Sequence, residues 1–308
     1  MHIILGAGGP VANALTKELS AANEKVRLVS RKPIETSGNT SWQRADLLDK
    51  NEVFSAVKEA SVIYLCAGLK YDQKIWAAQW PIIMQNVIDA AKQTGARLIF
   101  FDNVYMYGLV EGKMTEETPY RPCSVKGEIR AKTAATLMNE VKAGNIRASI
   151  LRGADFYGAT SSMNSVFDSM VLAKFAKKQS AMWLGNSKKL HAFTYVPDAG
   201  KALFLLGQNP QSDNKIWHAP TALALSGKQF IELAAKVFQT KPKFYSINLL
   251  MLRLIGIFDK TTAGAVEMFY QYDHDYVFDS GKFEQFFNVK PTAYETGFTE
   301  LRNTVFTG

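Results

Sequence analysis

The residues best suited to bind a ligand form a glycine-rich turn near residue 1. His2–Leu5 is apolar enough for a buried strand, and an amphipathic stretch with apolar residues at Val11, Ala12, Leu15 and Leu19 follows the turn. The turn itself consists of Gly6, Ala7, Gly8, Gly9, Pro10 and Val11. In a strand–turn–helix unit of this kind, backbone N–H groups at the positive end of the helix hold a pyrophosphate. We therefore predict a dinucleotide site, in which Gly6 permits the turn, Gly9 lets the backbone approach phosphate, and Ala12 allows close packing.

Two cations follow the second expected strand. Sites that prefer NAD usually carry an Asp or Glu there for the ribose 2′-hydroxyl, whereas a cation suits a 2′-phosphate. This chain has Arg31 and Lys32. We therefore expect NADP(H) as the preferred cofactor, with NAD(H) possible; the alternative is two solvated cations that begin a loop.

Two further strand ends complete the predicted cofactor site. Asp46 and Leu47 follow a weaker third strand and could contact the adenine, although Asp46 could equally be only a residue that precedes a helix. Cys66, Ala67 and Gly68 follow the fourth strand, and their small size leaves room for the ribose and nicotinamide. We expect Cys66 to be a packed residue and not a nucleophile.

These residues require a parallel sheet, because the carboxyl ends of parallel strands meet at one edge. Strands are expected at His2–Leu5, Lys25–Ser30, Ser41–Arg44, Val62–Leu65, Arg97–Phe101 and Arg147–Leu151. Helical patterns lie between them, at Val11–Ala21, Asn51–Glu59, Trp76–Thr94 and Glu128–Lys142. This alternation predicts an α/β, Rossmann-like doubly wound parallel sheet. Asp49 is expected to cap one helix, and Gly95 and Gly144 to end two others.

The second half is less regular and predicts a smaller, mostly helical lobe. Helical patterns occur at Ser165–Lys178, Asp198–Leu206, Gly227–Phe238, Asn248–Phe258 and Ala293–Thr304. We expect residues 1–155 to form the dinucleotide-binding core, with its sheet completed by about 188–220. Residues 156–187 and 221–308 would then form a substrate-binding lobe.

Composition excludes several classes of protein. The chain has 308 residues, 47% of them apolar, and a formal net charge of +8 that is spread over small clusters. We expect no nucleic-acid partner, no membrane partner and, from the scattered histidines, no metal. Two cysteines, Cys66 and Cys123, do not make a disulfide framework, so a reducing cytoplasm is expected. The first strand begins at residue 2, so we expect no signal peptide.

Five segments resemble one known family, in its order and from one end of the chain to the other. They are GAGGPVA, FFDNVYMYG, LRGADFYG, FTYVPDAGKAL and VFDSGKFEQFFNVKPT. They resemble the extended short-chain dehydrogenases/reductases, within them the NAD-dependent epimerase/dehydratase group. The resemblance implies the Rossmann-like fold, a nicotinamide dinucleotide cofactor and a small-molecule substrate. It also implies a monomer or homodimer.

The resemblance fails at the catalytic residues. The family uses Ser or Thr after the fifth strand, and then Tyr-x-x-x-Lys, in which the tyrosine exchanges a proton with the substrate. No Tyr-x-x-x-Lys occurs in this chain. Asn103 stands at the serine position, Lys126 at the tyrosine position and Arg130 at the lysine position.

Three interpretations remain open. In the first, the chain is an NADP(H)-dependent reductase or epimerase of a small carbonyl or hydroxyl substrate. Lys126 donates the proton and Asn103 polarises the carbonyl. Arg130 lowers the pKa of Lys126 and holds the nicotinamide ribose. The resemblance extends here to the isoflavone reductase-like group, which relies on a lysine. In the second, the protein is a non-catalytic NADP(H)-binding redox sensor. In the third, Tyr105 or Tyr107 supplies the proton. Lys126 could also be a solvated residue in the first turn of its helix.

Residues after the sixth strand predict a substrate pocket. Asp155, Phe156 and Tyr157 stand where the family's substrate loop begins, and His191 and Tyr195 precede the segment Val196-Pro197-Asp198. Aromatic and polar groups of this kind suit a ligand with an apolar body and few hydrogen bonds.

Overall fold

The computed structural model describes residues 1–158 and 165–306, and the chain divides into two compact units. The first unit comprises residues 1–106, 126–153 and 199–219, and the second comprises 107–125, 154–198 and 220–308. This division departs from the predicted one, because residues 107–125 and 188–198 belong to the second unit. The cause is strand pairing: β6 (Lys113–Met114) pairs with β15 (Val277–Phe278), and β10 (Leu190–His191) pairs with β13 (Leu225–Ser226).

A seven-stranded parallel sheet forms the centre of the first unit, in the order β12-β7-β5-β4-β1-β2-β3. The α/β, Rossmann-like doubly wound fold is thereby confirmed. The central strands are buried on both faces, as their apolar sequences predict. The strands are β1 (His2–Leu5), β2 (Val26–Ser30), β3 (Thr40–Arg44), β4 (Val62–Leu65), β5 (Arg97–Asp102), β7 (Ala148–Arg152) and β12 (Ile216–His218).

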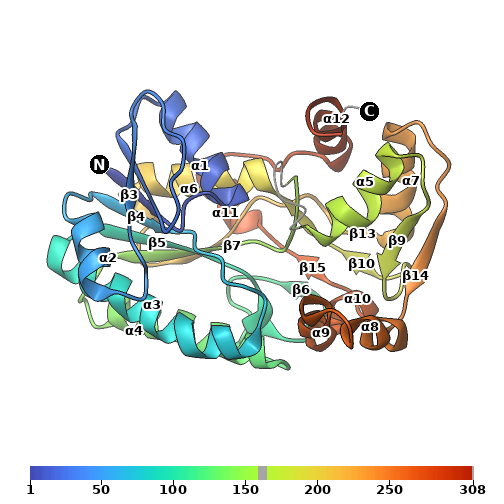
Figure 1. Cartoon of the computed structure of the whole chain (residues 1–308), viewed down its shortest axis with the longest axis horizontal. Coiled ribbons are helices and arrows are strands. Elements are labelled where there is room, and N and C mark those ends of the chain that lie inside the picture. Colours follow the sequence, from blue (N-terminus) through green and yellow to red (C-terminus); the bar gives the residue numbers. More distant parts are fainter. Residues whose placement is uncertain (159–164, 307–308) are drawn as a thin grey trace. The chain divides into compact units, whose positions relative to one another are not determined.

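Helices cover both faces of this sheet. In Figure 1, α1 (Pro10–Ala21) and α6 (Val196–Gln208) lie on one face, and α2 (Lys50–Val57), α3 (Gln73–Thr94) and α4 (Val125–Lys142) lie on the other. The predicted helix ends are confirmed. Asp49 accepts hydrogen bonds from two N–H groups of α2, and Gly95 and Gly144 adopt the left-handed conformation.

The strand order reverses at β1, where the chain passes from β3 to β4 on the other side of the sheet. The helices that follow β1 and β4 lie on opposite faces of the sheet (Figure 1), and the carboxyl ends of two such strands are where doubly wound folds bind ligands. The glycine turn follows β1, and the segment from Cys66 to Gly68 follows β4.

The second unit is built from short strand pairs and helices. Its remaining strands are β8 (Asp155–Tyr157), β9 (Ala181–Leu184), β11 (Phe193–Tyr195) and β14 (Phe244–Ile247). Its helices are a π-helical turn (Asp168–Leu172) that runs into α5 (Ala173–Ala176), α7 (Gly227–Val237), α8 (Leu249–Gly256), α9 (Lys260–Ala265), α10 (Tyr270–Asp273), α11 (Gly281–Phe287) and α12 (Tyr294–Thr304). An aromatic core holds this unit together, with Tyr157, Phe167, Phe230 and Phe298 among its buried residues.

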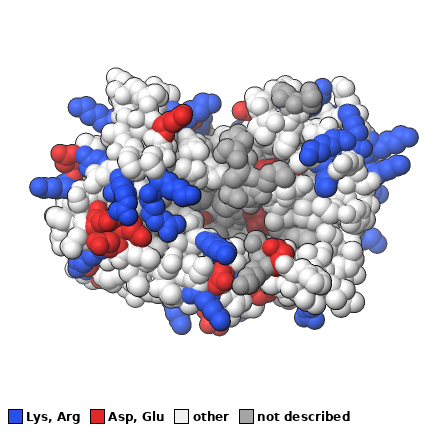
Figure 2. Space-filling model, viewed as in Figure 1, with Lys and Arg blue, Asp and Glu red and all other residues white. Residues whose placement is uncertain are grey.

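The charge of the molecule is dispersed. On the face in view, Lys and Arg side chains form several groups; those at the left have Asp and Glu beside them, and the group at the upper right has almost none (Figure 2). Several pair on the surface, including Lys50 with Asp89 and Lys92 with Glu140, both within the first unit.

Candidate active site

The glycine turn is fixed between β2 and β4. The N–H groups of Gly6 and Ala7 both donate to the carbonyl oxygen of Val29, each at 3.0 Å. Gly6 has φ +82°, and a Cβ atom there would lie 2.3 Å from the Cα of Ala67. Only glycine fits this position, because the loops after β1 and β4 touch there.

The turn leads into the open N-terminus of α1. Gly9 is the N-cap, its φ of −77° is ordinary extended backbone, and no side chain caps the helix. The first turn of α1 has no acidic residue, and a Cβ atom on Gly9 would meet nothing within 4 Å. Since the first N–H groups of a helix have no partner within it, this end can hold an anion such as a phosphate.

Arg31 and Lys32 lie exposed after β2. The Ser30 hydroxyl donates to the Lys32 carbonyl oxygen at 2.6 Å and accepts from Trp42 Nε1 at 3.0 Å, so the backbone before the two cations is held. Within residues 1–158 and 165–306, neither cation makes an ion pair, whereas the nearby Arg44 pairs with Glu52 at 2.9 Å. The two cations can therefore meet a ligand phosphate without first breaking an ion pair.

The other two strand ends have mainly structural contacts. Asp46 accepts from the N–H of Leu48 at 3.0 Å, and the Leu47 carbonyl accepts from Asn86 Nδ2 at 3.0 Å. Burial raises the pKa of the Cys66 thiol to about 12. Because the thiolate is the nucleophilic form, Cys66 is not activated at neutral pH.

A buried ion cluster includes Arg130, one of the predicted catalytic residues. Asp102, the last residue of β5, accepts two hydrogen bonds from Arg130 of α4, one of them from Nε at 2.6 Å. Arg152 ends the neighbouring strand β7 in register with Asp102, and its Nε lies 3.9 Å from the second carboxylate oxygen. The three side chains are almost completely removed from water.

The guanidinium of Arg130 also packs against aromatic rings. Its Cζ lies 4.2 Å from the ring centroid of Trp80 and 4.9 Å from that of Phe100, distances typical of cation–π contacts. Arg130 is thus tied to Asp102 and to these rings. The proposed like-charge effect of Arg130 on Lys126 overlooked this carboxylate, whose negative charge offsets that of the guanidinium.

Lys126 lies one helical turn before Arg130 on the buried side of α4. Its side chain is fully buried, so the alternative of a solvated residue is wrong. Its Nζ lies 4.2 Å from the ring centroid of Tyr71, and the Tyr71 hydroxyl donates to the Tyr105 hydroxyl at 3.3 Å. A lysine and two tyrosine hydroxyls from three separate segments thus lie together.

Asn103 borders the same cluster. Its Oδ1 accepts from the N–H of Tyr105 at 3.1 Å, so the donors of its amide are the part that can reach a carbonyl oxygen. Tyr105 stacks on Trp76, with ring centroids 6.3 Å apart. Tyr107, by contrast, is buried in the second unit and packs edge-on against Tyr120. Of the two tyrosines in the third interpretation, Tyr105 has its hydroxyl within this cluster.

In the second unit, the structure brings together two of the predicted substrate residues. His191 Nε2 lies 3.0 Å from Asp155 Oδ2, which also accepts from the Tyr272 hydroxyl at 2.7 Å. The imidazole ring stacks between Tyr272 and Tyr276. This contact rigidly orients the Asp155 carboxylate.

The other predicted substrate residues are placed differently. Tyr157 and Tyr195 stack on each other inside the aromatic core, with ring centroids 4.8 Å apart and both rings almost fully buried. They are core residues, which corrects the expectation that their rings line a pocket. Phe156, half-buried, accepts through its backbone carbonyl from Ser165 Oγ.

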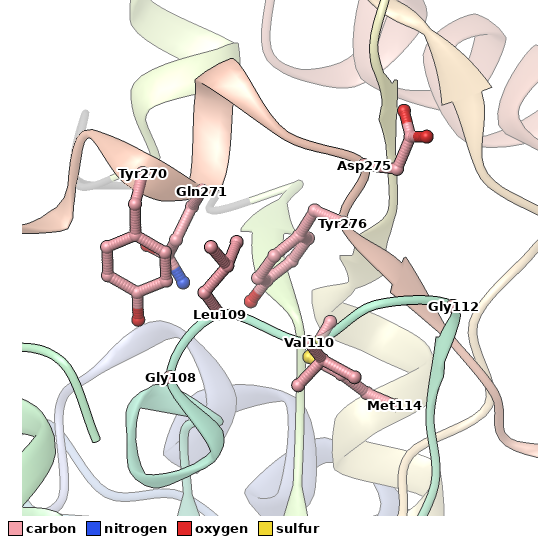
Figure 3. A pocket seen from close by; sticks show the side chains of 9 residues that line it. All are labelled: Gly108, Leu109, Val110, Gly112, Met114, Tyr270, Gln271, Asp275 and Tyr276. Atoms are coloured by element: carbon pink, nitrogen blue, oxygen red, sulfur yellow. The ribbon is translucent and has the colours of Figure 1, made fainter. Parts of the chain in front are cut away.

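A small recess lies elsewhere in the second unit. The side chains of Leu109, Gln271 and Tyr276 converge on it, with Tyr270 at its edge (Figure 3). Gln271 is 3% exposed, and its Nε2 has no hydrogen-bond partner in the described part of the chain. The recess therefore offers a donor to a small polar group.

Sequence reasoning missed Asp102, Arg152, Tyr71 and Tyr272. The sequence does carry a signal for Asp102 and Arg152. Each is a single charged residue at the end of an apolar strand, and opposite charges at the matched ends of neighbouring parallel strands can pair. Tyr71 and Tyr272 lie in segments whose place could not be read from hydrophobic periodicity.

A comparison with protein-family models decides the family. The model described as "NAD dependent epimerase/dehydratase family" matches residues 2–219, more than two thirds of the chain. The chain belongs to the NAD-dependent epimerase/dehydratase family. No curated protein gave a significant match. Among the described residues, every helix is too short or too polar to span a bilayer.

Solved structures of family members share the fold over nearly the whole chain. MoeE5 in complex with UDP-glucose and NAD is 19% identical with a TM-score of 0.78, covering 99% of this chain and 97% of its own. UDP-glucose 4-epimerase from Thermus thermophilus, in complex with NAD, is 16% identical with a TM-score of 0.77, covering 99% and 98%. dTDP-glucose 4,6-dehydratase from Bacillus anthracis, also with NAD, is 15% identical with a TM-score of 0.80, covering 99% and 95%.

Proposed function

We propose that this family member binds a nicotinamide dinucleotide at the carboxyl ends of β1, β2 and β4, with NADP(H) preferred. The open N-terminus of α1 would hold the pyrophosphate, and Arg31 and Lys32 would hold the 2′-phosphate. Asp46 and Leu47 would border the adenine, and Ala67 and Gly68 the ribose and nicotinamide. The solved relatives contain NAD, so the preference for NADP(H) rests on the two unpaired cations after β2.

We propose further that the chain reduces a small carbonyl compound, or oxidises or epimerises the corresponding alcohol. The nicotinamide supplies or accepts the hydride. In the reduction, the ammonium group of Lys126 gives a proton to the developing alkoxide, which leaves a neutral amine and an alcohol; oxidation is the reverse. The amide of Asn103 would donate a hydrogen bond to the same oxygen. Asp155, Phe156 and His191 remain the proposed substrate contacts.

The burial of Lys126 carries this proposal. A lysine side chain is almost never fully buried unless it is paired, because removing an ammonium group from water is costly. Here the buried lysine occupies the position at which the family pattern has its proton donor. Tyr105, in hydrogen-bond contact with Tyr71 beside Lys126, could relay the proton.

Substitution of Lys126 by methionine tests the catalytic role. NADPH oxidation would be followed with a panel of carbonyl compounds, and NADP+ reduction with a panel of alcohols and nucleotide sugars, including UDP-glucose, which MoeE5 binds. We expect Lys126→Met to lower turnover at least about 100-fold, the usual contribution of a general acid, with little change in the Kd for NADPH. Lys132→Met, at an exposed lysine of the same helix, is the matched control.

Equal turnover in Lys126→Met and wild type would refute the role of Lys126. NADPH binding without turnover on any substrate would instead support the redox-sensor interpretation.

Substitution of Arg31 by aspartate tests the cofactor preference. Because Asp suits a 2′-hydroxyl and repels a 2′-phosphate, Arg31→Asp should weaken NADPH binding at least tenfold more than NADH binding. Quenching of tryptophan fluorescence by each nucleotide measures both affinities. Equal losses would remove the assignment of Arg31, and failure of the wild type to bind either nucleotide would remove the cofactor site.

A further inference from the structure

Tyr71 lies in the loop after β4, which also carries two of the proposed cofactor contacts. Ala67 and Gly68 lie near the start of this loop, and Asp72 ends it as the N-cap of α3. Tyr71 is half-buried, and its ring faces Lys126, whose Nζ lies 4.2 Å from the ring centroid. One loop thus carries residues for both the cofactor and the proposed proton donor.

The ring of Tyr71 is held on several sides. Directly after it, Asp72 accepts two hydrogen bonds from the first turn of α3. Directly before it, the carbonyl oxygen of Lys70 accepts from Trp76 Nε1 at 2.9 Å. The Tyr71 ring packs edge-on against Trp76, with centroids 5.7 Å apart, and its hydroxyl donates to that of Tyr105. A ring fixed in this way can hold a cation at one place.

The face of an aromatic ring suits a buried proton donor. The Lys126 side chain is fully buried. Removal of an ammonium group from water favours the neutral amine, which is no longer an acid. A ring face attracts the ammonium charge and offsets part of this cost. The ring accepts no conventional hydrogen bond, so it does not compete with a substrate oxygen for the N–H groups.

We infer that Tyr71 is a positioning residue, and that the face of its ring holds the ammonium group of Lys126 in place for proton transfer to the substrate. The inference rests on the proposed role of Lys126 as the proton donor. It differs from a proton relay through the hydroxyls of Tyr71 and Tyr105, because the ring is the required part and the hydroxyl is not. Tyr71→Phe keeps the ring and removes the hydroxyl, whereas Tyr71→Leu removes both.

Steady-state kinetics of the full chain tests this distinction. We expect Tyr71→Leu to lower kcat about tenfold, as for loss of a desolvated cation–π contact, with a change of less than about twofold in KM and in the Kd for NADPH. Tyr71→Phe should keep at least about half of the wild-type kcat, because the ring face remains. Tyr245→Leu, at a tyrosine that is 51% exposed in the second unit, serves as the control and should keep wild-type kinetics.

Unfolding in urea tests the contact independently of any substrate. Tyr71→Leu should lower the urea midpoint more in the wild type than in Lys126→Met, because the ring stabilises an ammonium group and methionine carries none. Equal losses in the two backgrounds would overturn the inference, whether or not a substrate has been found.

The kinetic outcomes separate this inference from the proposed function. Wild-type kcat in Tyr71→Leu would overturn the inference, and so would an equal loss in Tyr71→Phe, because the hydroxyl would then be the required group. Both results would leave the role of Lys126 intact. Wild-type turnover in Lys126→Met would refute the proposed function itself, and the contact with Tyr71 would then serve stability alone. Unchanged Kd values for NADPH show that the variants are folded.

Discussion

Asp102 is the residue that fixes Arg130, one of the proposed catalytic residues. It holds Arg130 through two hydrogen bonds and lies beside Arg152, in surroundings almost without water. A buried ion pair adds little net stability, because the loss of hydration offsets the attraction between the charges. Its effect here is geometric: Arg130 is fixed on α4, one turn from Lys126.

Removal of the Asp102 charge should lower the free energy of unfolding substantially. In Asp102→Asn, both arginines would remain buried beside a neutral amide, and breaking one side of a buried pair typically costs about 3–5 kcal/mol. Asp89→Asn breaks the surface pair with Lys50 and should cost at most about 1 kcal/mol. Urea unfolding of the two variants measures the difference, and equal losses would show that Asp102 is not a key buried contact.

Sequence comparison could identify positions 103, 126 and 130, because the family pattern marks them. It could not predict their surroundings. The solvated alternative for Lys126 arose because a lysine in a first turn is usually exposed, and only the tertiary structure places Tyr71 over its ammonium group. Tyr157 and Tyr195 were misjudged for a related reason, since an aromatic residue after a strand suits a pocket and a core equally well.

At the scale of elements, two glycines of the strand–turn–helix unit meet different requirements, one for packing and the other for ligand binding. Gly6 is required by the fold, because its missing side chain lets the loops after β1 and β4 touch. Gly9 has an ordinary φ and open space around it, so the fold alone does not require glycine there. Its role is explained if a ligand approaches the backbone.

Alanine substitutions at the two glycines should therefore have different effects. Gly6→Ala should destabilise the protein by more than about 1 kcal/mol, because the new methyl group would overlap Ala67 and the positive φ disfavours alanine. Gly9→Ala should change stability by less than about 0.5 kcal/mol and still weaken NADPH binding at least tenfold. Thermal unfolding and fluorescence titration measure the two effects. Unchanged NADPH affinity in Gly9→Ala would argue against a phosphate at this turn.

The elements of the first half were predictable because their periodicity is strong. Its six strands and four helices occur within a few residues of the expected bounds, although α4 begins at Val125 instead of Glu128. In the second unit, α9, α10 and α11 and strands of two to four residues were not predicted. Segments this short carry little periodic signal and are held by contacts distant in sequence.

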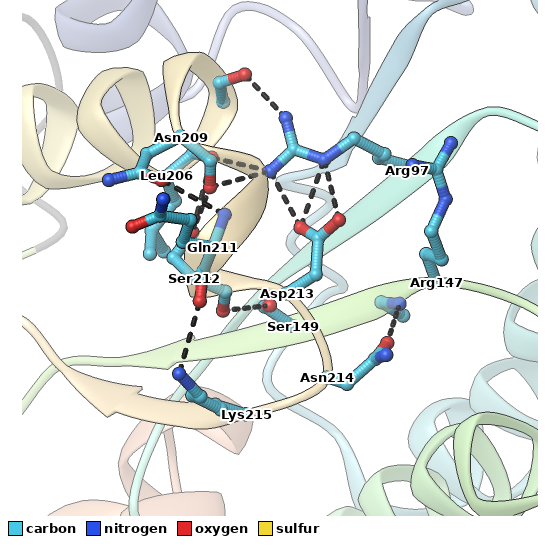
Figure 4. A network of polar contacts seen from close by, with 12 residues as sticks. Arg97, Arg147, Ser149, Leu206, Asn209, Gln211, Ser212, Asp213, Asn214 and Lys215 are labelled. Atoms are coloured by element: carbon cyan, nitrogen blue, oxygen red, sulfur yellow. Dashed lines mark hydrogen bonds and ion pairs between the residues drawn. The ribbon is translucent and has the colours of Figure 1, made fainter.

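Arg97 shows how such distant contacts complete the sheet. Located at the start of β5, it donates to the carbonyl oxygens of Leu206, Gly207 and Asn209 at the end of α6 (Figure 4). It also pairs with Asp213 at 2.6 Å, just before β12. More than one hundred residues separate these partners. The end of α6 and the start of the seventh strand are thus fixed by a single side chain.

At the scale of the whole molecule, burial of ionisable side chains limits the stability of the fold at high pH. Burial is the largest cause of the raised pKa of the Tyr64, Tyr157, Tyr195 and Tyr294 hydroxyls, and it also raises the pKa of the Cys66 thiol. Each of these groups ionises more readily in the unfolded chain. Their contribution to stability is therefore fully present below the unfolded pKa and is lost as pH rises through the folded pKa.

The protein should consequently unfold cooperatively at alkaline pH, with the buried tyrosines ionising in the same transition. Near pH 11, each buried tyrosine favours the unfolded chain by about 1.4 kcal/mol, given an unfolded pKa of about 10. Tyr157→Phe should move the transition to higher pH, because its buried hydroxyl has no hydrogen-bond partner among the described residues and its removal costs little in the fold. Tyr245→Phe, at a tyrosine that is 51% exposed, should leave the transition unchanged. Phenolate absorbance and circular dichroism would be followed together. Ionisation of every tyrosine before any loss of structure would show that these hydroxyls are accessible to water.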